Sequence, residues 1–125
     1  MDHRIGIGKA AEEICARQLS SLGWLVLARN WRIKAGELDI VALEETTLVI
    51  VEVKSHRTGS KIGPTSPVLA VGPSKQRRLR RLAGAWVAAN AHRALFEQVR
   101  FDVVGVTFDR QGGVLKFEHF EDAFQ

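Results

Sequence analysis

The chain has 125 residues, of which 46% are hydrophobic and 26% charged, and its formal net charge is +4. This length and composition predict one folded domain over residues 1–125 and exclude a disordered chain. A single cysteine excludes an internal disulfide framework and a thiolate zinc site. No apolar run approaches the roughly 18 residues that span a bilayer, and the N-terminus lacks the pattern of a secretory signal. We therefore expect a cytoplasmic protein without a membrane partner, whose charge is compatible with a polyanion.

Hydrophobic periodicity and turn signals predict two helices and five strands. The first helix should end before Gly23, and Ser74 is expected as the N-cap of the second. The predicted order is a helix at 5–22, strands at about 24–33, 36–44 and 47–54, a loop at 55–73, a helix at 74–94, and strands at about 99–108 and 114–120. This order favours a single α/β domain in which a mixed sheet carries helices on its surface.

Two carboxylates come into register when the strands at 36–44 and 47–54 are folded into a hairpin. A turn of two or four residues pairs positions whose numbers sum to 91. Asp39 then lies opposite Glu52, and Glu37 opposite Lys54, on one face of the hairpin. Facing carboxylates repel each other, so a chain that keeps them usually places a cation between them. With Lys54 two residues after Glu52, the layout is typical of a metal-dependent nuclease.

Magnesium suits such a site because it prefers oxygen ligands, often one or two carboxylates together with phosphate and water. A metal on Asp39 and Glu52 could activate a water and neutralise charge on a phosphate, while Lys54 positions the attacking water. The alternative is an exposed polar face on an amphipathic hairpin. The apolar run at 48–51 disfavours this alternative, because it predicts burial on both faces of the strand. Charged residues at the end of a buried strand are costly unless they serve a function.

Helix 5–22 contributes a third candidate acid. Glu12 falls at the edge of the apolar stripe, from where it could lean over the sheet toward the acid pair, whereas Glu13 points to solvent. Glutamates at the border of a helix are also common without a function.

A basic run begins the second predicted helix. Residues 75–81 contain five cations in seven positions, and cations near a helix N-terminus oppose the helix dipole. A nucleic-acid backbone would account for them, and a solvated basic face is the alternative. Arg29, Arg32 and Arg57 add positive charge around the proposed site. The four histidines show no ligand spacing and are expected mostly at the surface, although His56 could touch a phosphate.

Several motifs in order resemble one bacterial family. They are Gly36-Glu37-Leu38-Asp39-Ile40-Val41, Val51-Glu52-Val53-Lys54-Ser55, Lys75-Gln76-Arg77-Arg78-Leu79, Arg29-Asn30-Trp31-Arg32 and Arg100-Phe101-Asp102-Val103-Val104. Together they resemble the YraN family, which is similar to archaeal Holliday junction resolvases and belongs with the PD-(D/E)xK nucleases. The likeness covers nearly the whole chain.

The resemblance implies a restriction-endonuclease-like fold with Asp39, Glu52 and Lys54 as the motif residues. It aligns the family's helix glutamate with Glu12, although alanine stands at position 11, where the family has glycine. It also makes Gln76 a counterpart of the helix glutamine found in some relatives. Related resolvases act as dimers, so the resemblance raises a homodimer as an option.

Our leading hypothesis is a magnesium-dependent endonuclease acting on DNA, including branched or other structured DNA. Glu12, Asp39 and Glu52 would hold Mg²⁺, with Mn²⁺ as the alternative, and Lys54 would orient the water. The predicted nucleic-acid-binding residues are Arg29, Arg32, Arg57, Lys75, Gln76, Arg77, Arg78 and Arg81. A non-catalytic nucleic-acid-binding module on the same fold is the rival hypothesis. A scaffold whose basic helix contacts an acidic protein is a third.

Overall fold

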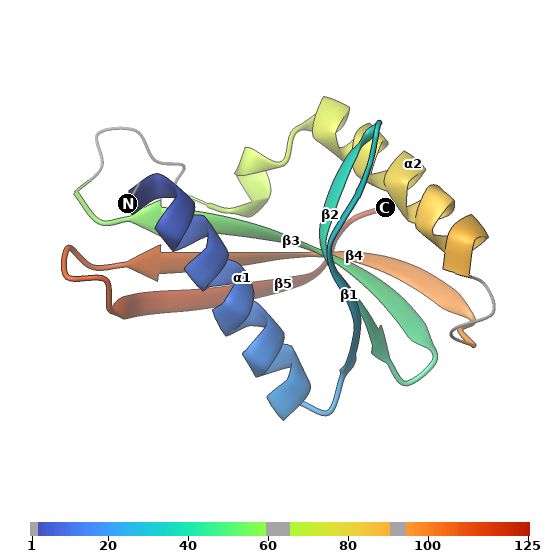
Figure 1. Cartoon of the computed structure of the whole chain (residues 1–125), viewed down its shortest axis with the longest axis horizontal. Coiled ribbons are helices and arrows are strands. Elements are labelled where there is room, and N and C mark those ends of the chain that lie inside the picture. The colour runs from blue at the N-terminus through green and yellow to red at the C-terminus, as the bar shows by residue number, and fades with distance from the viewer. Residues whose placement is uncertain (1–2, 60–65, 91–94) are drawn as a thin grey trace.

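The computed structural model describes residues 3–59, 66–90 and 95–125 (Figure 1). Two α-helices, one short 3₁₀ helix and five strands make up this part of the chain. In chain order they are α1 (His3–Ser21), β1 (Leu25–Ile33), β2 (Gly36–Glu44), β3 (Thr47–Arg57), η1 (Val68–Ala70), α2 (Pro73–Asn90), β4 (Gln98–Phe108) and β5 (Val114–Phe124).

The five strands form one mixed sheet in the order β1-β2-β3-β4-β5. Only β3 and β4 run parallel, and the other neighbours are antiparallel. The chain crosses from β3 to β4 through η1 and α2, as a parallel connection requires. The fold is thus the predicted one, a single α/β domain with a restriction-endonuclease-like mixed sheet flanked by two helices.

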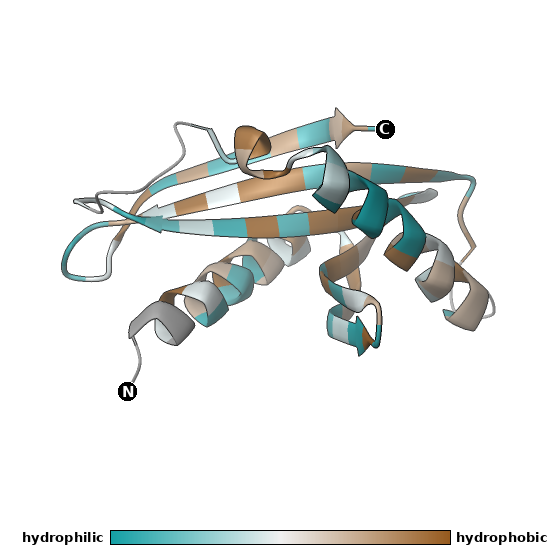
Figure 2. Cartoon of the chain, turned by 90° about the horizontal axis from the view of Figure 1, so that it is seen from above, coloured by the Kyte–Doolittle hydropathy of each residue, from teal (hydrophilic) through white to brown (hydrophobic). Residues whose placement is uncertain are grey.

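Each face of the sheet is covered by one helix. Ala11, Cys15 and Leu19 of α1 pack against one set of strand residues, and Leu79 and Trp86 of α2 pack against the other set. Because β3 contributes to both hydrophobic clusters, its first half is buried on both sides, as the apolar run predicted. Figure 2 shows the apolar stretches of the central strands in brown and the polar start of α2 in teal.

The predicted register of the β2–β3 hairpin is correct from Glu44–Thr47 to Ile40–Val51. The turn has two residues, and Glu45 adopts a φ of 52° there. Beyond Val51 the two strands no longer pair, while β3 continues beside β4 as far as Arg57. Figure 1 shows β2 turning away from β3 toward α2. The expected pairing of Glu37 with Lys54 is therefore wrong, and Asp39 and Glu52 are not ladder partners either, since the strands have diverged before both points.

Helix α1 begins and ends slightly earlier than the predicted 5–22, and three other element boundaries differ from the sequence prediction. Residues 55–57 are strand instead of loop, because each of them pairs with β4. Helix α2 begins at Pro73, so Ser74 lies inside the helix and is not its N-cap; proline suits the first helical position, where no N–H is needed. Strand β5 continues to Phe124, whose ring stacks on Phe101 at 5.1 Å. The predicted loop residues 60–65 and helix residues 91–94 lie outside the described part of the chain.

Candidate active site

The two predicted carboxylates lie together where β2 leaves β3. Asp39 Oδ2 accepts a hydrogen bond from the backbone N–H of Val53 at 2.8 Å. This bond takes the place of a ladder bond that β2 can no longer supply, since regular pairing ends at Val51. The divergence of the strands therefore brings a carboxylate, rather than a backbone carbonyl, against the second half of β3.

Glu52 is the most deeply buried acid of the site, with 5% of its surface exposed. A buried carboxylate requires a counter-charge, and two ammonium groups supply it. Lys54 Nζ lies 3.3 Å from Glu52 Oε2, and Lys75 Nζ lies 3.4 Å from the same oxygen. Lys54 therefore contacts Glu52, the acid next to which the sequence placed it. Lys75 also contacts Glu52, which the spacing of residues along the chain did not predict.

Lys75 was predicted only as a nucleic-acid-binding residue of the basic run. It belongs to the first turn of α2, and the β3–β4 crossover places that turn over Glu52. The need of a buried acid for a cation was the signal that could have pointed to such a partner. No sequence pattern identified which lysine it would be.

Asp39 has a strongly perturbed acidity. Burial raises the pKa of Asp39 to about 8, and the neighbouring carboxylate of Glu52 adds to the effect by repulsion and by hydrogen bonding to the protonated form. The hydrogen bond from Val53 opposes this shift, and the more distant charge of Glu12 reinforces it. Without a metal ion, the site thus favours a proton on Asp39 at neutral pH, as expected for two neighbouring buried acids.

Glu12 is connected to β2 by the side chain of Asn30. The amide Nδ2 of Asn30 donates to Glu12 Oε1 at 2.9 Å and to Glu37 Oε1 at 3.0 Å, so it links α1 to β2. Asn30 holds a φ of 51° within β1, a left-handed conformation that asparagine tolerates better than most residues. The sequence analysis quoted Asn30 only as part of a motif and missed this bridge.

The predicted set of three metal ligands is only partly assembled. Asp39 and Glu52 lie together, while Glu12 is hydrogen-bonded to Asn30. Among the residues that the structure describes, no group of three or more His, Cys, Asp or Glu side chains is close enough to hold a metal ion. The assignment of Glu12 as a ligand stays a prediction.

Two of the predicted DNA-binding arginines form ion pairs within the protein. Arg29 Nη1 lies 2.8 Å from Glu13 Oε2, and Arg32 Nη2 lies 2.8 Å from Glu37 Oε2. Glu13, which was expected simply to face solvent, thus anchors β1 to α1. Hydrogen bonding to Arg29 lowers the pKa of Glu13, and hydrogen bonding to Arg32 lowers the pKa of Glu37. Their charges are therefore partly compensated before any ligand binds.

The remaining predicted DNA-binding residues differ in their exposure and in their contacts within the protein. Arg77, Arg78 and Arg81 are exposed on α2, where Arg77 and Arg81 line a shallow surface depression. Gln76 donates to the backbone carbonyl of Val71 at 2.9 Å, which fixes the start of α2. Arg57 is half-buried, and its Nε finds no hydrogen-bond acceptor among the described residues.

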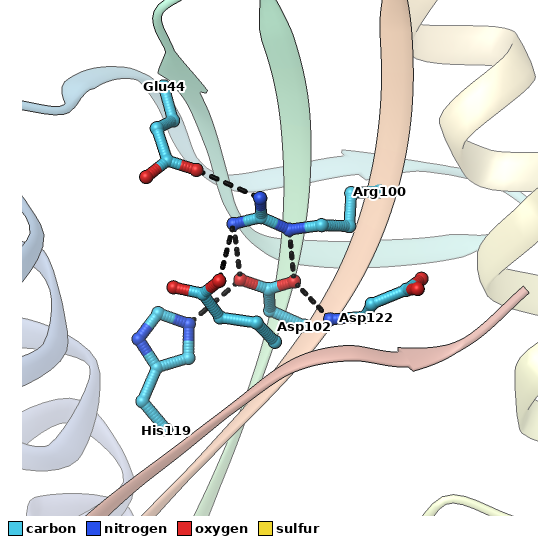
Figure 3. A network of polar contacts seen from close by, with 6 residues as sticks. Glu44, Arg100, Asp102, His119 and Asp122 are labelled. Atoms are coloured by element: carbon cyan, nitrogen blue, oxygen red, sulfur yellow. Dashed lines mark hydrogen bonds and ion pairs between the residues drawn. The ribbon is translucent and has the colours of Figure 1, made fainter.

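A second polar cluster, unforeseen from the sequence, lies between β4 and β5 (Figure 3). Asp102 is fully buried and accepts hydrogen bonds from Arg100, from His119 at 2.8 Å and from the backbone N–H of Asp122 at 3.0 Å. Arg100 also donates to Glu44 at 2.8 Å. Burial favours a raised pKa for Asp102, but the bonds from His119, Arg100 and Asp122 outweigh it and lower that pKa.

The histidine prediction is wrong for His119, whose side chain is only 15% exposed. Its imidazole contacts Asp102 on one side and meets the ring of Trp24 edge-on at 5.5 Å. His56 is half-buried. His92 and the side chain of His3 lie outside what the structure describes.

The sheet and its buried acids define the class of this protein, a restriction-endonuclease-like α/β domain with an acid pair and a lysine at a strand divergence. The family model of "Uncharacterised protein family UPF0102" matches residues 11–106. The chain belongs to this family, the YraN family, as its motifs suggested.

Relatives from several bacteria match over most of their length. A UPF0102 protein of Parafrankia sp. is 45% identical over 118 residues, covering 94% of this chain and 95% of the relative. One from Rhodococcus opacus is 40% identical over 124 residues, covering 99% and 100%. One from Acidothermus cellulolyticus is 41% identical over 118 residues, covering 88% and 87%. Separately, none of the helices in the described part of the chain is long and apolar enough to cross a membrane.

Proposed function

We propose that this protein is a magnesium-dependent endonuclease that hydrolyses phosphodiester bonds in DNA, with branched or otherwise structured DNA as its substrate. The observation that carries the proposal is the contact set of Glu52: a buried carboxylate beside Asp39, with the ammonium groups of Lys54 and Lys75 at 3.3 and 3.4 Å. Acids and lysines so arranged at the end of a buried strand combine cation affinity with phosphate affinity.

The donor set fits a divalent magnesium ion. Mg²⁺ prefers oxygen ligands and commonly uses one or two carboxylates, with waters and phosphate in its other positions. Asp39 and Glu52 offer two carboxylates, and the raised pKa of Asp39 reflects burial and, in addition, repulsion by Glu52 that a cation would relieve. Glu12 is the proposed third ligand, with Mn²⁺ as an alternative metal. When bound, the metal would supply charge neutralisation and a more acidic water.

The protein's own groups would perform the remaining work. Lys54 would orient the attacking water and stabilise charge on the phosphate, since its ammonium lies beside Glu52 on the part of β3 that β2 no longer pairs with. Lys75 would hold a phosphate oxygen from the α2 side once a cation replaces it on Glu52. Val53 keeps Asp39 in place through its backbone N–H. Preorganised positive charge of this kind lowers the barrier of phosphoryl transfer.

The exposed arginines of α2 would bind the nucleic-acid backbone. Within the described part of the chain, Arg77, Arg78 and Arg81 make no ion pairs of the kind that engage Arg29 and Arg32. Contacts of this type provide affinity that is independent of sequence. Arg57, with a buried Nε and no acceptor among the described residues, is a further phosphate-binding candidate.

The decisive experiment is calorimetric titration of MgCl₂, and separately MnCl₂, into wild type and Asp39→Asn. We expect the heat of binding to vanish in the variant, because the amide loses the negative charge while it can still accept the bond from Val53. Glu121→Gln removes a carboxylate from an exposed position on β5 and serves as the control. Cleavage assays over junction, flap and single-stranded DNA would follow.

Equal metal binding by wild type and Asp39→Asn would refute the metal site. A non-catalytic nucleic-acid-binding module is the second candidate. It is favoured by the way two lysines already neutralise Glu52. DNA binding without metal binding or cleavage would establish that reading.

A further inference from the structure

A cavity of about 160 Å³ lies next to Lys54, in a part of the sheet that the acid pair does not use. Two alternate rungs across three strands, separated by the rung of Ser55 and Val106, form its base. One rung is Lys54–Gly105–Glu118, and the other is His56–Thr107–Lys116. Side chains on alternate rungs project to the same face of the sheet. The other lining residues are Ser55, Pro67 and Val106.

The shape of the cavity depends on a glycine. Gly105 has no side chain between Lys54 and Glu118, and a Cβ at this position would overlap the ring of Pro67. The chain that precedes η1 therefore rests directly on the backbone of β4. The proline ring supplies an apolar surface beside the polar side chains of the two rungs.

The chemistry of the lining is mixed. Lys54 and Lys116 carry positive charge, and Lys116 Nζ lies 3.4 Å from Glu118 Oε2. His56 and Thr107 can donate and accept hydrogen bonds. An apolar ligand would leave these groups without partners, and a bare anion would leave the proline surface unused. A nucleotide, with a phosphate and a flat apolar base, matches both parts.

We infer that this cavity binds an unpaired nucleotide next to the phosphate under attack, an inference that rests on the proposed nuclease function. Lys54 joins the two sites, because it contacts Glu52 and also lines the cavity. A base that is stacked in a duplex cannot enter such a cavity without leaving the stack. The substrate class is therefore DNA with an unpaired nucleotide beside the cleavage position, such as a flap, a gap or a branch point.

Thymidine 5′-monophosphate is the probe, titrated into ¹⁵N-labelled protein and followed by amide chemical shifts, with inorganic phosphate and thymidine titrated separately. We expect the nucleotide to shift the amides of Gly105, Val106 and Thr107, and to bind more tightly than either fragment. Lys116→Ala should raise its Kd about tenfold, since a charge-assisted contact is lost. Glu118→Gln should lower the Kd about two- to fivefold, because a negative charge near the phosphate is removed.

Arg17→Ala is the matched control, because it removes one cation from an exposed position on α1. The inference is overturned if thymidine monophosphate leaves the cavity amides unshifted, or if Lys116→Ala behaves like Arg17→Ala. Tighter binding of inorganic phosphate alone would also overturn it. Nucleotide binding by a protein that takes up no metal would instead support the cavity and refute the nuclease. Cleavage of flap DNA with unaltered KM in Lys116→Ala would refute the cavity alone.

Discussion

At the scale of single residues, Asp39 is the group whose chemistry depends most on its surroundings. It has one fixed hydrogen bond, from the backbone of Val53, and a carboxylate neighbour in Glu52. Its raised pKa means that the folded protein holds a proton at Asp39 that the unfolded chain releases at an ordinary, lower pH. Stability and cation binding are therefore linked to the same oxygen atoms.

Without metal, the protein should lose stability as the pH rises from about 4 to 8. The contribution of a group with a raised pKa is complete below its unfolded value and is lost as the pH passes the folded value, which for Asp39 is about 8. Asp39→Asn should remove this pH dependence and raise the Tm at pH 9 by roughly 3–6 °C, about 1 kcal/mol for a domain of this size. Thermal unfolding in EDTA at several pH values measures it.

A comparison at about pH 3 is the internal control, because Asp39 is protonated there in both the folded and the unfolded wild type and the two proteins should differ little. Saturating magnesium should flatten the wild-type profile, since metal binding displaces the proton. A wild type that gains stability between pH 5 and 9 in EDTA, with Asp39→Asn following the same curve, would contradict the assigned coupling.

At the scale of elements, the cluster around Asp102 holds the second half of the sheet together. Asp102 accepts bonds from two residues of β5, His119 and Asp122, and Arg100 extends the cluster to Glu44 at the end of β2. The guanidinium of Arg100 also lies over the ring of Trp24, 5.4 Å from its centroid. This cluster explains why β5 continues to Phe124, beyond the end predicted from apolar alternation.

Asp102→Asn should lower the free energy of unfolding at pH 7 by about 2–4 kcal/mol, because it removes the fully buried charge partner of Arg100 and His119 and leaves Arg100 only the more exposed Glu44 and Glu121. The pKa of Asp102 is lowered in the folded state, so its stabilisation is present at neutral pH and is lost as the pH falls below its ordinary value. The difference between variant and wild type in urea unfolding should therefore shrink toward pH 3.

Glu121→Gln provides the matched control for Asp102→Asn, since its carboxylate is 57% exposed and lies 4.0 Å from the same arginine. Surface ion pairs of this kind contribute about 0–1 kcal/mol. Magnesium binding should survive in both variants, because none of the hydrogen bonds and ion pairs among the described residues joins the cluster to Asp39 or Glu52. Equal unfolding midpoints for the two variants would show that Asp102 has no special role.

At the scale of the whole molecule, some cations are already paired with acids of the protein, and others are exposed to solvent. The formal net charge is +4, yet Arg29, Arg32 and Arg100 are engaged with acids of the protein. The exposed cations of α2 are therefore available to bind a polyanion. The acid pair lies beside the first turn of the same helix, where Lys75 contacts Glu52. DNA bound along α2 would therefore pass the candidate active site.

DNA binding should weaken steeply as salt rises, and removal of α2 arginines should reduce that dependence. Each phosphate contact contributes about 0.9 to the slope of log K against log salt on duplex DNA. Arg77→Ala combined with Arg81→Ala should thus reduce the slope by about 1.8. Fluorescence anisotropy with labelled duplex and junction DNA measures it. Arg17→Ala on α1 should leave the slope unchanged, and a slope that is insensitive to the α2 double variant would place the DNA elsewhere.

Much of the architecture could be predicted from local signals. The turn between residues 44 and 47 determined the register of the β2–β3 hairpin, because closing it with two or four residues pairs positions whose numbers sum to 91. The apolar face of α2, with Leu79 and Trp86 buried, followed from helical spacing. Motif order identified the family, and with it the fold.

Contacts between distant segments could not be predicted in this way. Lys75 reaches Glu52 only because the β3–β4 crossover sets the start of α2 over the sheet. Asn30 joins Glu12 to Glu37 through a left-handed residue inside a strand, and no periodicity signals that conformation. The buried cluster of Asp102 likewise brings together residues from three strands, each of which resembles an ordinary surface residue in the sequence.

By itself, the sequence determined the class of fold, the hairpin register and the identity of the acid pair and its lysine, because these depend on side-chain alternation and hydrophobic burial over short stretches. Tertiary structure alone decided which charges are neutralised, where β2 leaves β3, and that a cavity lies beyond Lys54. Those features depend on distances between segments far apart in the chain, and only packing of the two helices on the sheet sets such distances.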